Sequence, residues 1–180
     1  MKKEQLLELL DSWENLALII RDFGDDATHF SLLMEIALHS GEHKSWRAAW
    51  LADKIHDKFP ELILPYLEEM IKSLKELNNP GKKRQFLKLI SLHPTPDAYD
   101  GFLTGYCLDT LMSGKEPPAV RVYAMQILYN ISEKEPELKP ELIDVIENEM
   151  ELHPTPGILT RGKKILKKLY GQRKSWQLRE

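Results

Sequence analysis

AVRVYAMQIL, residues 119–128, combines one arginine with apolar residues placed three and four positions apart. That spacing puts the apolar side chains on one face of an α-helix. Three other segments start at an arginine in the same way: RAAWLADKI at Arg47, RQFLKLISL at Arg84 and RGKKILKKL at Arg161. The arginines at 47, 84 and 121 are 37 residues apart, and the fourth follows 40 residues after the third. A period of this length predicts a chain built from repeated structural units.

Prolines recur between these segments. FPEL at 59–62 leads to Pro65 and EPEL at 135–138 leads to Pro140, while LHPTP occurs at both 92–96 and 152–156. A proline in the first turn of a helix leaves no backbone hydrogen bond unmade. Thr95 and Thr155 are suited to cap the helices that follow, and His93 and His153 are interpreted as residues of the same turn in two copies. We therefore expect helices over 3–22 (with Ser12 a candidate break), 26–39, 44–58, 63–77, 81–92, 96–113, 118–133, 139–151 and 156–170.

The composition favours helices and excludes several classes of protein. Leucine occurs 29 times, whereas valine occurs three times and threonine six, and strands prefer β-branched residues. No apolar run approaches the ~20 residues that span a bilayer, and the acids near the amino terminus do not fit a secretory signal. The only cysteine, Cys107, lies in an apolar stretch and predicts a buried side chain in a reducing compartment. We expect a cytoplasmic protein without a membrane partner.

The segment 119–128 closely resembles the V-R-x-x-A-x-x-x-L phrase that opens one helix of a HEAT repeat. The segment from Trp46 to Leu51 is similar, and that from Lys83 to Leu87 is a weaker third copy. The resemblance extends over residues 26–170. The acidic residue that usually precedes the arginine has no match, because Ser45, Lys82 and Ala119 occupy its neighbourhood.

This resemblance implies an all-α fold, a right-handed α-α superhelix of the HEAT and armadillo kind. We expect one domain over 1–180, made of an N-terminal helical cap (1–25), about four helix pairs (26–170) and a basic C-terminal tail (171–180). HEAT-like proteins mostly act as curved binding scaffolds, so the resemblance implies a binding surface and no particular reaction.

The arginines 47, 84 and 121 allow two interpretations. In the first, they form a cationic ladder whose guanidinium groups bind phosphates or carboxylates of a ligand. In the second, each arginine bonds carbonyls or acids of a neighbouring repeat and holds the stack together. The sequence favours the second interpretation and does not exclude the first.

Charge is distributed unevenly near the carboxyl end. Residues 161–180 carry eight basic side chains against Glu180, a net charge of +7, whereas the whole chain has a net charge of −3. Residues 133–151 contain eight acids and two lysines. The basic segment is interpreted as the polar cap of the last repeat. An acidic protein partner or a nucleic-acid backbone are the alternatives, and for them the binding residues would include Lys163, Lys164, Lys167 and Trp176.

Trp46 and Arg47 form a second candidate binding site. This pair resembles the HEAT-like DNA alkylation-repair glycosylases, which hold a lesion against aromatic rings and use an acidic residue to assist. In this chain Asp53 would be the nearest acid. An enzyme that binds DNA normally has a positive net charge, whereas this chain has a net charge of −3. Trp50 aligns with Leu87 and is therefore expected in the core, whereas Trp46 is expected to be partly exposed.

Motifs for catalysis and metal binding are not found in the sequence. Glu35, His39 and His43, and the group of Asp53, His56 and Asp57, do not supply the three or four convergent ligands of a zinc site. No nucleophile elbow, phosphate-binding glycine loop or paired cysteine motif occurs. The aromatic row Tyr99, Phe102 and Tyr106 fits either a core or a peptide groove. We expect no cofactor.

Together these patterns predict a non-enzymatic scaffold that presents a curved helical surface to a protein partner. The alternative is a nucleic-acid-binding module resembling the HEAT-like alkylation-repair proteins.

Overall fold

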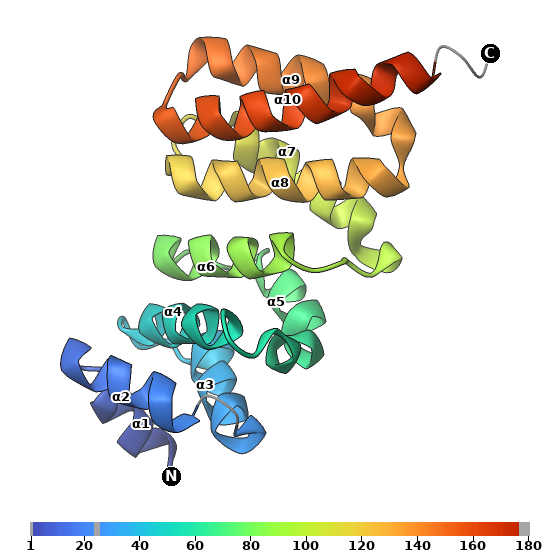
Figure 1. Ribbon diagram of the computed structural model, residues 1–180. Helices are drawn as coiled ribbons and strands as arrows, with labels where there is room; N and C mark the ends of the chain where they lie inside the picture. Colours follow the sequence, from blue (N-terminus) through green and yellow to red (C-terminus); the bar gives the residue numbers. More distant parts are fainter. Residues whose placement is uncertain (1, 24–25, 177–180) are drawn as a thin grey trace. The chain divides into compact units, whose positions relative to one another are not determined.

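The computed structural model describes residues 2–23 and 26–176, apart from the side chains of residues 13, 16, 22, 23 and 173–176. These described residues form ten α-helices, three 3-10 helices and no strand, which confirms the predicted all-α class (Figure 1). The chain divides into two compact units, residues 1–90 and 91–180.

The first unit contains an N-terminal helical segment followed by paired helices. Its elements are α1 (Lys3–Leu9), α2 (Trp13–Phe23), α3 (Ala27–His39), α4 (Ser45–His56), the 3-10 helix η1 (Pro60–Tyr66), α5 (Leu67–Ser73) and α6 (Pro80–Ser91), whose last residue begins the second unit. The break expected near Ser12 is confirmed. Asp26 is the N-cap of α3, and its Oδ1 accepts hydrogen bonds from the backbone N–H groups of Thr28 and His29 (2.8 and 3.3 Å).

The second unit contains two helix pairs. Its elements are η2 (Asp97–Tyr99), α7 (Asp100–Met112), α8 (Pro118–Lys134), η3 (Pro136–Leu138), α9 (Lys139–Leu152) and α10 (Pro156–Trp176). Helix α7 packs against α8, and α9 packs against α10. Helices α8 and α10 lie side by side, with α7 behind α8 (Figure 1).

Two predicted helices and one predicted cap differ from the structure. The segment 96–113 begins with the 3-10 helix η2, and α7 starts only at Asp100. The segment 63–77 is not a single helix, because its first part is 3-10 helix and α5 begins only at Leu67. Pro65 has no N–H to donate within an α-helix, which explains the tighter turn. Thr155 accepts a hydrogen bond from the backbone N–H of Ile158 (3.4 Å), as predicted for a cap. Thr95 does not cap α7, because its hydroxyl donates to the Asp100 carboxylate (2.8 Å).

The two LHPTP segments occupy different places in the fold. The first, at 92–96, joins α6 to α7 and so connects one helix pair to the next. The second, at 152–156, joins α9 to α10 within a pair. The interpretation of His93 and His153 as the same turn in two copies is therefore wrong. The copies are 60 residues apart, which is not a multiple of the 37-residue arginine period.

Each unit has its own apolar core. Side chains without exposed surface include Leu33, Met34, Leu51, Ile55, Leu103, Leu111, Ala124 and Ile146. Cys107 is also fully buried, as the sequence predicts. Burying one large aliphatic side chain contributes about 1.5–3 kcal/mol. At Gly162 a Cβ would lie 3.2 Å from Ile146 Cγ2, so the glycine lets α10 approach α9 closely.

Candidate functional site

Arg47 lies in the first turn of α4 and binds the end of α1. Its Nη1 donates to the carbonyl oxygens of Leu10 and Asp11, each at 2.7 Å. The last carbonyl groups of a helix have no partner within that helix and carry the negative end of its dipole. The guanidinium group of Arg47 therefore caps α1 from a neighbouring helix.

Arg121 has the corresponding place in α8, and it is more deeply buried. Its Nε donates to the carbonyl oxygen of Leu111 (2.8 Å), one residue before α7 ends. Its Nη2 forms an ion pair with Glu149 of α9, and Glu149 Oε2 also lies 2.8 Å from His153 Nδ1. Arg121 is only 2% exposed, so its guanidinium group is bound within the fold.

The capping cation between these two is a lysine. Lys82, in the first turn of α6, donates from Nζ to the carbonyl oxygen of Ser40 (2.9 Å), which follows the last residue of α3. Its side chain is buried, and this burial lowers the pKa of its ammonium group. Arg84, which the 37-residue period singles out, is exposed. The period thus identifies the correct helix, while the bond is made two residues earlier.

Trp46 and Asp53 do not meet at a shared opening. Trp46 is half-buried, and a Cβ at Gly81 would lie 3.2 Å from its Cβ, so it packs against the start of α6. The Asp53 side chain is 4% exposed and pairs with Lys88 of α6 at 2.5 Å. Trp50 is half-buried, with Lys54 Nζ 5.8 Å from its ring centroid. The buried, paired Asp53 does not offer its carboxylate to a bound base.

Glu149 and His153 complete the contacts around Arg121, and the sequence patterns do not predict this role. Glu149 is one of the eight acids of residues 133–151, yet it is 2% exposed. A signal was present, because Leu142, Ile146, Glu149 and His153 follow one helix face at steps of four, three and four. A carboxylate on an apolar face requires a buried cation.

Helix α10 displays a group of lysines that no other described residue binds. Lys163, Lys164 and Lys167 are exposed and form no ion pair or hydrogen bond within the described part of the chain. Two neighbouring basic residues do have contacts within the fold. Arg161 donates a hydrogen bond to Gln126 (2.6 Å), and Lys168 Nζ lies 4.9 Å from the ring centroid of Tyr129. The side chain of Trp176, the last residue of α10, lies outside the described residues.

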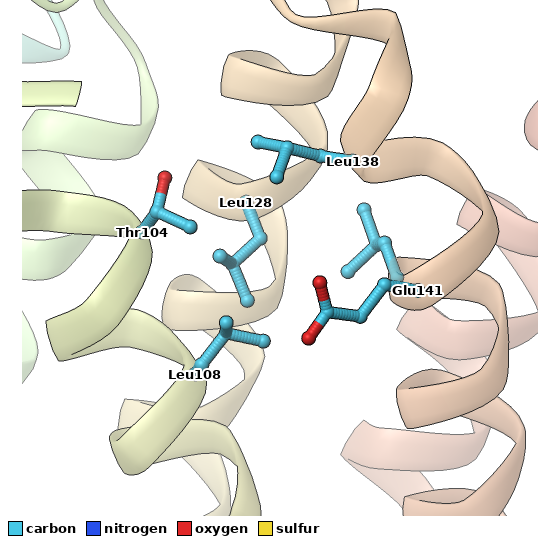
Figure 2. Close-up of a pocket in the computed structure, with 6 residues that line it drawn as sticks. Thr104, Leu108, Leu128, Leu138 and Glu141 are labelled. Atoms are coloured by element: carbon cyan, nitrogen blue, oxygen red, sulfur yellow. The ribbon is translucent and has the colours of Figure 1, made fainter. Parts of the chain in front are cut away.

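A small apolar pocket lies between α7 and α9, on the α8 surface. Thr104 and Leu108 of α7, Leu128 of α8 and Leu138, Glu141 and Leu142 of the η3–α9 segment line this α7–α9 pocket (Figure 2). Its volume is about 10 Å³, close to the least that holds one water molecule. Figure 2 shows the Glu141 carboxylate directed across the pocket toward Leu108.

The remaining candidate groups are accounted for by local contacts. Tyr99, Phe102 and Tyr106 are half-buried, and the ring centroids of Phe102 and Tyr106 are 5.7 Å apart. Glu35 pairs with Lys3, and His39 with Glu69. Within residues 2–23 and 26–176, no group of three His, Cys, Asp or Glu side chains is arranged to hold a metal ion. None of the described helices is both long and apolar enough to cross a bilayer.

Comparison with known proteins identifies a family but no individual relative. A family model described as a HEAT repeat domain matches residues 3–169. No curated protein and no solved structure matches the chain.

Proposed function

The chain belongs to the HEAT-repeat family, and on that premise we propose that it is a non-enzymatic scaffold that binds another protein on a curved helical surface. The family match confirms the predicted HEAT-like architecture, and HEAT repeats commonly mediate protein interactions. The proposal assigns no cofactor and no reaction to the chain.

The α10 lysines carry this proposal. Lys163, Lys164 and Lys167 hold three positive charges on exposed turns of one helix, and none of them forms an ion pair within the described residues. Exposed charged side chains contribute little to the stability of a fold, so folding does not require these lysines. They are suited to carboxylates of a partner, where complementary charge increases the association rate and the specificity.

The alternative partner is a nucleic acid, and its phosphates would be bound by the same lysines. Three features favour a protein. The chain has a net charge of −3, Asp53 is buried against Lys88, and the guanidinium groups of Arg47 and Arg121 are bound to backbone carbonyls. A nucleic-acid surface usually needs a larger group of free cations.

The test is an affinity purification from lysate, with and without nuclease and at two salt concentrations. We compare the native chain with the double variant Lys163→Gln/Lys167→Gln. Lys58→Gln/Lys115→Gln is the matched control, because it removes the same charge from two other exposed lysines. The proposal expects a protein that survives nuclease, is lost with the α10 variant and is retained by the control.

Two results would contradict the protein proposal. Recovery of nucleic acid that disappears with nuclease and at high salt would support the alternative, since phosphate contacts weaken steeply with salt. Equal recovery of the same protein by both variants would show that the α10 lysines are not its binding site.

A further inference from the structure

A larger pocket lies in the first unit, between the end of α3, helix α5 and the start of α6. It is lined by Ser40 and Gly41 after α3, by Glu69 of α5 and Glu76 of the following turn, and by Lys82 of α6. Its volume is about 710 Å³. Small-ligand pockets have volumes of about 300–1,000 Å³, so this Lys82 pocket is large enough for such a ligand.

Lys82 is a buried cation without an acid as its partner. Three lysine or arginine side chains are buried among the described residues. Arg121 pairs with Glu149, and Lys139 pairs with Glu133 at 2.8 Å. Lys82 is 6% exposed and forms no ion pair with a described carboxylate. Because a buried charge is costly, lysine is rarely buried without an opposite charge beside it.

The Lys82 ammonium group has more donors than the fold uses. It carries three N–H groups, and one of them donates to the carbonyl oxygen of Ser40 at 2.9 Å. This oxygen is a neutral acceptor at the negative end of the α3 dipole, so it offsets only part of the cost of burying the charge. Burial lowers the pKa of Lys82, and no carboxylate acts to raise it. The carboxylate that Glu149 supplies to Arg121 has no counterpart at Lys82 among the described residues.

The acids of the pocket do not neutralise Lys82. Glu69 pairs with His39 at 3.0 Å, and Glu76 is exposed and forms no ion pair within the described residues. Both acids line the pocket, so a ligand with a second negative charge would meet repulsion there. The pocket is therefore suited to a ligand with a single carboxylate.

We propose that the Lys82 pocket binds a monocarboxylate ligand, whose carboxylate accepts hydrogen bonds from the Lys82 ammonium group. The rest of the ligand lies against Leu38 and Leu77, two apolar residues that also line the pocket. The carboxylate belongs either to a free small acid or to the C-terminal residue of a peptide, and its chemistry at Lys82 is the same for both. The site does not involve the α10 lysines, so this proposal and the proposed function can fail separately.

The first test titrates the full chain with sodium acetate, and with sodium chloride at the same ionic strength as the reference. NMR of isotope-labelled lysine side chains reports binding, and loss of one signal in Lys82→Met assigns the Lys82 resonance. The proposal expects a saturable shift of this resonance with acetate only, together with a rise in the pKa of Lys82, because a carboxylate favours the charged form. Equal responses to the two salts, or no saturable shift with acetate, would overturn the proposal.

Larger probes identify the source of the carboxylate. Butyrate represents the free acid, and an acetylated tripeptide of two alanines and a leucine represents the peptide end. Tighter binding of one or the other decides between the two sources. The same tripeptide with a C-terminal amide should not bind, and equal affinity of the acid and the amide would contradict the role of the carboxylate. Succinate should bind less tightly than butyrate, and the reverse order would show that the pocket does not select a single charge.

Two variants separate binding from folding, with the amide signals of Leu38 and Leu77 as the readout. Lys82→Met keeps an aliphatic stem and should lower the affinity at least about tenfold, the effect of losing one hydrogen bond to a charged group. Gly41→Gln leaves Lys82 in place and adds a side chain at the pocket, where a Cβ would meet no atom within 4 Å. It should weaken binding without lowering the melting temperature.

Gly105→Gln of α7 is the matched control, since it also adds a side chain where a Cβ would meet no atom within 4 Å, outside the pocket. It should leave the affinity for butyrate unchanged, and so should Lys163→Gln/Lys167→Gln. Native affinity of Lys82→Met would overturn the proposal. Native affinity of Gly41→Gln would show that the carboxylate binds outside the Lys82 pocket, which would also overturn it.

Discussion

Arg121 of α8 and Glu149 of α9 form an ion pair in which both side chains are 3% exposed. The pair joins one helix pair to the next, and the same arginine binds the carbonyl oxygen of Leu111 at the end of α7. His153 contacts Glu149 from the turn after α9. Three helices of the second unit therefore meet at one guanidinium group, which occupies the position of the arginine in the family phrase.

Arg121→Ala is expected to be strongly destabilising, since it leaves the Glu149 carboxylate buried without its cation. Breaking a buried pair in this way costs about 3–5 kcal/mol. Urea unfolding of the variant measures this loss. The double variant Arg121→Met/Glu149→Leu should recover part of it, because no unpaired charge remains. An unchanged unfolding midpoint for Arg121→Ala would contradict the structural role of the residue.

Lys82→Ala and Arg84→Ala should differ although they are two residues apart on α6. Lys82→Ala removes the bond to the Ser40 carbonyl oxygen and the buried aliphatic stem, at an expected cost of about 1–3 kcal/mol. Arg84→Ala removes an exposed side chain and should change stability by no more than about 0.5 kcal/mol. Thermal unfolding of both variants checks the order, and the reverse order would show that the arginine period identifies the capping residue.

His56 should make the first unit less stable in mild acid. Burial lowers the pKa of His56 from 6.5, although Asp53 and Asp57 oppose the shift and Lys88 reinforces it. As pH falls through about 6.5, the unfolded chain binds a proton that the folded chain does not, so the free energy of unfolding decreases. The measurement is the unfolding midpoint between about pH 7.5 and pH 5.5, the range in which histidine titrates.

His56→Gln is the control for this acid effect, because glutamine does not titrate. The variant should lose the part of the pH dependence that belongs to this residue. An identical pH profile for the native chain and the variant would mean that His56 takes up its proton as readily in the folded chain as in the unfolded one.

Asp26 should stabilise α3 most while it is ionised. The backbone N–H groups of Thr28 and His29 lower its pKa from 3.8. The part of the stabilisation that depends on the charge is therefore complete above about pH 3.8 and is lost as pH falls through the lower value of the folded chain. Asp26→Ala should lower the melting temperature at neutral pH, and Asp26→Asn should lower it less because asparagine also caps helices. Equal losses for the two variants would show that the cap hydrogen bonds contribute nothing.

The α10 lysines should be dispensable for folding. Lys163, Lys164 and Lys167 are exposed and contact no described partner, so replacing all three with glutamine should change stability by less than about 0.5 kcal/mol. Calorimetry of the triple variant measures this. A large loss of stability would place these lysines in the packing and would contradict their proposed role in binding.

The sequence predicts the helices well where the signal is local. The break at Ser12 and the cap at Thr155 depend on a few consecutive residues, and both are present in the structure. Thr95 has the same neighbours as Thr155, yet its hydroxyl binds Asp100, whose carboxylate also pairs with Lys134 of α8. A cap is a local preference, and a cation from a distant helix changes which hydrogen bond is most favourable.

Apolar spacing and proline positions predict the all-α class and the HEAT repeat, because both act within single helices. Which basic residues are bound and which are exposed depends on the packing of the helices against one another. Lys82, Arg47 and Arg121 lie at helix ends where carbonyl groups need donors, whereas the α10 lysines extend into solvent. The physical reason is that the partner of a charged side chain comes from another helix, and its position depends on packing that no single segment encodes.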